Sequence, residues 1–193
     1  MKETWDDPPD PLDALQRGDR SPYEAFVRDA AGDLAGFFRR FGAAQADAED
    51  LVQDVFLKMY RSHHNYRPEG RFRAFVLRTA RNAWVDRARR RGARPRLVAG
   101  SGTSEDGPGA LDLAVDESLR EPAAALEAQE TRGRVGQALQ ALSEPHQLVF
   151  ELGVVQELPY AQIAELLEVP VGTIKSRMFH AVRRLRELLG EEF

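Results

Sequence analysis

The sequence contains no cysteine, no long apolar run and only four histidines. Without cysteine the chain can form no disulfide, thiolate zinc site or cysteine nucleophile. No apolar stretch approaches the roughly 18 residues that a membrane helix needs. The N-terminus, MKETWDDPPD, is acidic and proline-rich and lacks the apolar stretch of a signal peptide. We therefore expect a cytoplasmic protein with no membrane partner.

The histidines offer little basis for a metal site. Two of the four are adjacent, at His63 and His64, and no third ligand is spaced nearby. We interpret them as polar loop groups and expect neither a metal nor another cofactor. Hydrophobic residues make up 42% of the 193 residues, which is enough to bury a core. At roughly 150 residues per domain, this length predicts one domain or two small ones.

The net charge of −4 conceals two blocks of opposite charge. Residues 71–96 contain ten arginines and a single acid, Asp86, so this segment has a charge of +9. Residues 101–130 contain eight acids and one arginine, which gives a charge of −7. The positive block is typical of a polyanion-binding segment. The sequence therefore points to nucleic acid despite its acidic net charge.

Apolar residues at three- and four-residue intervals predict a first helix that begins at Ser21. Ser21 is expected to cap it, with Pro22 at the first helical position and Glu24 completing a capping box. Gly42 then supplies a stop for this helix.

Two further helices complete a predicted N-terminal helical domain. One starts near Asp47 and has an apolar face and an acidic, polar face. The other runs from about Arg71 to Arg91 and places arginines opposite its apolar positions. Beyond it the composition changes to Gly, Pro, Ser and acids, as in Gly100–Gly109 (GSGTSEDGPG). This change predicts a flexible linker.

Helical periodicity returns after Pro122 and restarts near Ser143. Two short helices follow at about Tyr160–Leu167 and Val171–Leu189, and this spacing is typical of a helix-turn-helix. The exposed face of the second helix suits the major groove and carries Thr173, Lys175, Ser176, Arg177, Phe179 and His180. An ordinary helical hairpin with a solvated basic face is the alternative.

Three segments, in this order, resemble the extracytoplasmic-function (ECF) sigma factors of bacterial RNA polymerase, within the sigma-70 family. Asp47–Tyr60 (DAEDLVQDVFLKMY) is similar to the helix with which such factors grip the polymerase clamp. Phe72–Arg91 resembles their promoter-melting segment. Leu158–Leu189 (LPYAQIAELLEVPVGTIKSRMFHAVRRLRELL) resembles the domain that binds the upstream promoter element.

The resemblance implies an all-α fold of two small helical domains joined by a flexible acidic linker, the C-terminal one a helix-turn-helix. The expected divisions are an acidic N-terminal tail (1–20), sigma domain two (21–92), the linker (93–121) and sigma domain four (122–193). The implied function is promoter-specific initiation as an alternative sigma factor for a regulated gene set. The implied partners are promoter DNA and core RNA polymerase, at its beta-prime clamp and beta flap. An anti-sigma protein is left open as a further partner.

Residue roles follow by position from the same resemblance. Asp50, Gln53 and Asp54 would contact the beta-prime clamp helices. The four-residue spacing agrees, because it puts both carboxylates on one helical face; a solvated acidic face is the alternative. In the third helix, Asn82 and Asp86 would read the minus-ten promoter element.

Phosphates and an unpaired base would be bound close to Asn82. The arginines expected to neutralise phosphates are Arg78, Arg81, Arg87 and Arg89. The preceding loop, His63–Gly70, falls where a flipped base would be held. Trp84 or Tyr66 could stack on such a base, although we favour a packing role for Trp84.

Two features depart from the common family pattern. Glu168 occupies a turn where glycine is usual, and a left-handed backbone there would cost about 1 kcal/mol. His180 and Val182 stand where the recognition helix often carries arginine, so we expect fewer phosphate contacts from this helix.

Two functions of other classes compete with this interpretation. An autonomous helix-turn-helix regulator would need a dimer interface, and the sequence contains no obvious dimer helix. A small hydrolase or nuclease would have to use helix acids such as Asp47, Glu49, Asp50 and Asp54. These acids lack a matched base, nucleophile or metal-ligand set, so we expect a protein that is not an enzyme.

Overall fold

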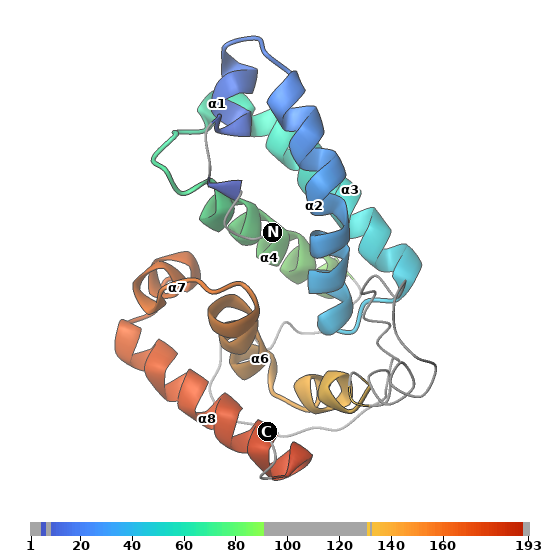
Figure 1. Ribbon diagram of the computed structural model, residues 1–193, viewed down its shortest axis with the longest axis vertical. Helices are drawn as coiled ribbons and strands as arrows, with labels where there is room; N and C mark the ends of the chain where they lie inside the picture. The colour runs from blue at the N-terminus through green and yellow to red at the C-terminus, as the bar shows by residue number, and fades with distance from the viewer. Residues whose placement is uncertain (1–4, 7–8, 91–130, 132, 191–193) are drawn as a thin grey trace, which may run out of the picture. The chain divides into compact units, whose positions relative to one another are not determined.

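The structure is a computed structural model that describes residues 5–6, 9–90, 131 and 133–190 (Figure 1). The regular elements within these ranges are all helical, which confirms the predicted all-α class. They fall into two units, made of Met1–Phe38 with Gln45–Pro95 and of Arg39–Ala44 with Arg96–Phe193. The predicted linker at 93–121 lies outside the described residues.

The first unit begins with a short helix inside the segment that composition alone assigned to a tail. Pro11–Gln16 form helix α1, which Asp10 caps. One carboxylate oxygen of Asp10, Oδ1, accepts hydrogen bonds from the N–H groups of Leu12 at 3.0 Å and Asp13 at 3.2 Å. The predicted tail at 1–20 therefore contains folded residues.

Three long helices and one turn follow: α2 (Ser21–Arg40), α3 (Gln45–Ser62), the 3₁₀ turn η2 (His63–Asn65) and α4 (Phe72–Arg90). All of them belong to the first unit except the last two residues of α2. The prediction that Ser21 caps α2 is wrong by one residue. Ser21 is already helical, because the Glu24 N–H donates to the Arg20 carbonyl at 3.0 Å. The Ser21 N–H is instead accepted by the Asp19 carboxylate at 3.0 Å.

Aromatic side chains hold these helices together, and Figure 1 shows α2 and α3 running alongside each other next to α4. Phe26 of α2 packs edge-on against Phe56 of α3 and Phe72 of α4, with ring centroids 5.8 and 4.8 Å apart. The Tyr23 hydroxyl donates to the Phe56 carbonyl at 2.6 Å. Burial raises the pKa of Tyr23 to about 12, so this hydroxyl keeps its proton at neutral pH.

The second unit contains a helix at 133–140 and then α6 (Glu144–Phe150), the π-helix η4 (Glu151–Val155), α7 (Tyr160–Leu167) and α8 (Val171–Leu189). This order confirms the predicted restart near Ser143 and the helix-turn-helix pair. Ile163 of α7 and Ile174 of α8 are both fully buried. Their burial holds α8 in a defined place on α7.

Gly153 of η4 allows a close approach to α8. A Cβ at this position would lie 2.6 Å from the Met178 Cε, so any larger residue would displace that side chain. The methionine of α8 therefore fills the space over this glycine.

The turn between α7 and α8 keeps the geometry for which glycine is usual. Glu168 has φ 56° and ψ 43°, in the left-handed region. The Val169 N–H donates to the Ala164 carbonyl at 3.0 Å, which is the six-to-one bond of a Schellman motif. The domain therefore tolerates the backbone strain that the sequence predicted at Glu168.

Candidate polymerase and nucleic-acid interface

The outer face of α3 presents a stripe of side chains to solvent. Asp50, Gln53 and Asp54 are all exposed on it, so the structure brings the three predicted clamp residues together. Leu57 is 50% exposed and continues the stripe by one turn. Sequence reasoning missed Leu57, although its three-residue spacing from Asp54 was an available signal. Two carboxylates, an amide and an apolar side chain form a surface suited to a basic partner.

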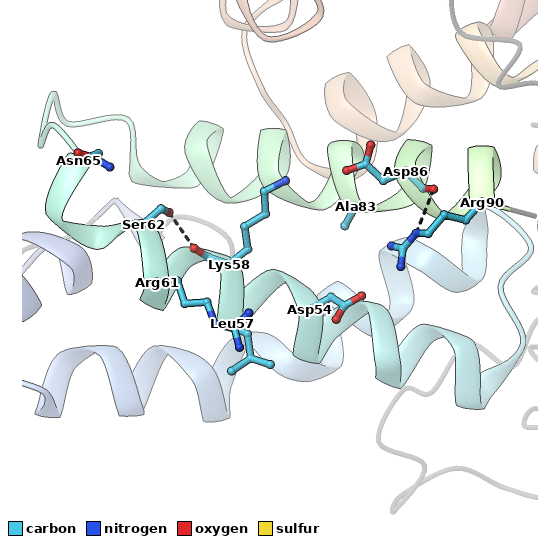
Figure 2. Close-up of a pocket in the computed structure, with 9 residues that line it drawn as sticks. All are labelled: Asp54, Leu57, Lys58, Arg61, Ser62, Asn65, Ala83, Asp86 and Arg90. Atoms are coloured by element: carbon cyan, nitrogen blue, oxygen red, sulfur yellow. Dashed lines mark hydrogen bonds between the residues drawn. The ribbon is translucent and has the colours of Figure 1, made fainter.

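A groove of about 510 Å³ is lined by residues of α3, the 3₁₀ turn η2 and α4 (Figure 2). Asp54 of α3 and Asp86 of α4 lie on its wall. The basic side chains in its lining are Lys58, Arg61 and Arg90. Arg90 is anchored in its own helix, since its Nε donates to the Asp86 carbonyl at 3.3 Å. The groove joins the acidic stripe of α3 to the predicted DNA-contacting face of α4.

Helix α4 carries the six polar residues predicted to contact promoter DNA in the first unit, of which Arg87 is treated separately below. Arg78, Asp86 and Arg89 are exposed, whereas Arg81 and Asn82 are half-buried. The Arg81 Nη1 lies 3.4 Å from the Asn82 Oδ1, in a long hydrogen bond. A guanidinium group and an amide thus form one polar surface on this helix.

Arg87 is committed to a contact inside the unit. Its Nη2 forms an ion pair with the Asp47 carboxylate at the start of α3. Both side chains are largely buried, with 19% and 24% of their surface exposed. We therefore correct the expectation that Arg87 neutralises phosphate, because its guanidinium joins α4 to α3.

Tyr66 is also removed from the predicted DNA surface. Its side chain is 8% exposed, and its ring packs edge-on against Phe75 with centroids 4.9 Å apart. Its hydroxyl donates to the Asp10 Oδ2 at 2.6 Å. The pKa of Tyr66 is raised well above its ordinary value, chiefly by burial and secondly by this hydrogen bond to Asp10. The prediction that Tyr66 stacks on an unpaired base is therefore wrong. Trp84 is half-buried on α4.

The recognition helix α8 exposes the side chains predicted for it. Lys175, Ser176, Phe179 and His180 are exposed, while Thr173 and Arg177 are half-buried. Phe179 is the most exposed large apolar side chain among the described residues, at 64%. An apolar group on the exposed face of such a helix suits contact with a thymine methyl group.

His146 of α6 lies against this helix, and sequence reasoning missed it. Its ring stacks on that of His180, with centroids 5.9 Å apart and planes at 30°. Burial, and then the nearby charges of His180 and Arg177, lower the pKa of His146. No sequence signal joined these two histidines, because they lie on separate helices.

Within residues 5–6, 9–90 and 133–190, no group of three or more His, Asp or Glu side chains could hold a metal ion. The rings of His63 and His64 lie 3.7 Å apart. No helix in the same ranges is both long and apolar enough to cross a membrane.

The chain matches two family models that together cover most of these surfaces. Residues 26–94 match sigma-70 region 2, and residues 132–185 match sigma-70 region 4. The first match includes the α3 stripe and α4, and the second includes α7 and α8 as far as residue 185.

Curated relatives align along most of the chain. The RNA polymerase sigma-H factor of Pseudomonas aeruginosa is 29% identical over 173 residues, which is 88% of this chain and 87% of that protein. The ECF RNA polymerase sigma-E factor of Escherichia coli is 27% identical over 174 residues, again 88% of this chain and 87% of that protein.

Solved structures share the fold. The sigma factor RpoE from Bartonella quintana, solved with the anti-sigma factor NepR, superposes with a TM-score of 0.61 at 22% identity. This match covers 88% of this chain and 95% of that one. CnrH, solved with the cytosolic domain of CnrY, gives a TM-score of 0.63 at 22% identity and covers 92% and 94% of the two chains. With both regions matched and these relatives aligned along most of its length, the chain belongs to the sigma-70 family, as an ECF sigma factor that directs transcription initiation.

Proposed function

We propose that this sigma factor binds the beta-prime clamp of core RNA polymerase through the exposed stripe of α3. The observation that carries this proposal is the exposure of Asp50, Gln53 and Asp54 on one face of a helix whose opposite face is buried. The helix is packed into the core of the unit, so its carboxylates can meet a basic partner without first ordering a flexible segment. Leu57 adds an apolar contact to the same surface.

Promoter reading in the first unit is assigned to α4 and the loop before it. The Asn82 amide can donate to and accept from a base edge, and the Asp86 carboxylate can accept from a cytosine amino group. Arg78 and Arg89 are exposed and can neutralise phosphates. The loop 63–70 is assigned to an unpaired base, with its exposed residues 67–70 toward the DNA strand.

Promoter reading in the second unit is assigned to α8 in the major groove of the upstream element. Lys175 and Arg177 would contact phosphates, and Ser176 and Phe179 would contact bases. His180 stands where the recognition helix often carries arginine, so we infer fewer phosphate contacts from this helix. The beta flap of the core enzyme is the proposed second contact of this unit.

We further propose that the chain is a binding subunit rather than an enzyme, and that it works in the cytoplasm, where core polymerase acts. The predicted domain limits, 21–92 and 122–193, are retained as proposals, supported by family matches at 26–94 and 132–185. An anti-sigma protein is proposed as a regulator, by analogy with the solved complex of RpoE and NepR.

Charge reversal on α3 tests the clamp assignment. Asp54→Lys should weaken binding to core RNA polymerase by roughly 30-fold, or about 2 kcal/mol, because it places a cation against a basic partner. Far-UV circular dichroism should be unchanged, since Asp54 is exposed. Competition with the unmodified protein for core enzyme measures the effect.

The matched control is Asp29→Lys, an identical charge reversal at an exposed position of α2. It should change core binding by less than about twofold. If Asp54→Lys competes as well as the unmodified protein, the clamp assignment fails. If both variants lose affinity alike, net charge and not the α3 stripe governs the association.

A further inference from the structure

The N-terminal residues 5–6 and 9–16, here called the N-terminal brace, contact both ends of the loop 63–70. At the start of the loop, the Gln16 side chain is the link. Its Nε2 donates to the His63 carbonyl at 2.6 Å and to the Tyr66 carbonyl at 2.8 Å. One amide group thus holds two carbonyls three residues apart in the turn that opens the loop.

A second contact holds Tyr66 itself. Asp10 uses one oxygen to cap α1 and the other, Oδ2, to accept the Tyr66 hydroxyl at 2.6 Å. The Tyr66 ring is wedged between the brace and α4, since it also packs on Phe75. The backbone of the loop is therefore pinned beside its exposed residues, 67–70.

A third contact lies at the far end of the loop, where α4 begins. The Asp6 Oδ1 accepts the backbone N–H of Arg73 at 2.8 Å and so satisfies one of the unpaired donors of the first turn. Trp5 is 8% exposed and packs edge-on against Phe26, with ring centroids 5.5 Å apart. This aromatic contact anchors Asp6 to the core of the unit.

We propose that the N-terminal brace is a positioning element that sets the shape of the loop 63–70 and thereby the choice of the promoter base held there. This inference rests on the proposed role of that loop in binding an unpaired base. Composition alone suggested no function for the acidic N-terminal segment, and positioning of this loop would be that function. The brace does not touch the base, and it acts through Gln16, Asp10 and Asp6 on the backbone around the loop.

Because Gln16 is exposed, its replacement can alter the position of the loop without unfolding the unit. Gln16 is exposed, so water can replace its hydrogen bonds to the two carbonyls when the amide is removed. The unit should remain folded after this change, while the turn gains alternative conformations. A looser turn presents the base site in several shapes, and discrimination between bases depends on a fixed arrangement of polar groups.

The test uses holoenzyme assembled from core RNA polymerase and the full chain, transcribing a promoter library randomised over the downstream element. Sequencing of the transcripts gives the base preference at each position. With Gln16→Ala, the preference at one downstream position should fall at least threefold, while preferences at the other positions and affinity for core enzyme stay within about twofold. Arg17→Ala is the matched control, because Arg17 is exposed and pairs with Asp13 inside α1 at 2.7 Å.

A merely structural role would move a different quantity. If Gln16→Ala lowers transcription equally from every template, or leaves every preference unchanged, the positioning proposal is overturned. Should that variant misfold, Tyr66→Phe decides by the same readout, because it removes only the hydroxyl and keeps the packed ring. Asp10→Asn should rescue much of the preference relative to Asp10→Ala, since the amide oxygen can still accept the Tyr66 hydroxyl.

A second variant, Asn82→Ala, removes a side chain that is proposed to contact a promoter base directly. It is measured with the same promoter library. If Asn82→Ala flattens a downstream preference and Gln16→Ala does not, only the role of the brace is refuted. If neither variant changes any downstream preference, promoter reading by the first unit is refuted as well.

Discussion

The left-handed turn at Glu168 allows a stability change to be worked out from backbone geometry. At φ 56° and ψ 43° the Cβ of a non-glycine residue crowds the following carbonyl, at a cost of about 1–2 kcal/mol. Glycine removes this cost, but it also lowers the free energy of unfolding by roughly 0.4–1 kcal/mol because the unfolded chain gains conformational freedom. Glu168 is exposed, so the substitution forfeits no burial. Glu168→Gly should therefore stabilise the second unit by about 0.5–1 kcal/mol.

Amide hydrogen exchange of α7 and α8 at a fixed pH is the appropriate assay. Both tryptophans of the chain, Trp5 and Trp84, lie in the first unit, so their fluorescence does not report on the second. Glu165→Gly is the matched control, because the same replacement at a helical position of α7 should cost about 1 kcal/mol. Unchanged or reduced protection in Glu168→Gly would refute the argument from backbone strain.

Two further predictions concern DNA reading and pH. In promoter-library transcription, Asn82→Ala should relax a downstream base preference by about 1–3 kcal/mol, whereas Lys175→Ala should weaken many upstream sequences alike; equal losses on all promoters would contradict this division. The pKa of His146 is lowered in the folded state, so folding favours the neutral form of this side chain. The second unit should therefore be most stable above the ordinary pKa of 6.5 and should lose stability as the pH falls below that value. Calorimetry of the full chain between about pH 7.5 and 5.5 should show a smaller decline in His146→Gln, and an identical pH slope in both proteins would count against this linkage.

The helices of this protein are encoded locally and could be predicted from sequence. Helices α7 and α8 run over the predicted residues, and α4 does so to within one residue at each end. Apolar spacing and the stop signal at Gly42, where φ is 89°, depend only on residues close together in the chain. The shared face of Asp50 and Asp54 follows from helical geometry alone. These properties need no knowledge of how the helices pack.

The helix cap at α2 shows the limit of local reasoning. Ser21, Pro22 and Glu24 fit a capping box, yet Asp19 accepts the Ser21 N–H and the helix begins earlier. Several residues near the boundary can satisfy the same donors. The choice among them depends on the path of the preceding chain, which here continues from α1.

Only the tertiary structure decided which polar and aromatic side chains remain available for binding. Tyr66 and Arg87 are each plausible DNA contacts by type and position, but Asp10 and Asp47 engage them from distant parts of the chain. A sequence pattern reports the face of a helix, not the partner that a fold brings to it. The contacts of the N-terminal brace with the loop 63–70 were likewise visible only in the tertiary structure. Its contacts join residues far apart in sequence, and hydrogen bonds of that kind exist only once the helices have packed.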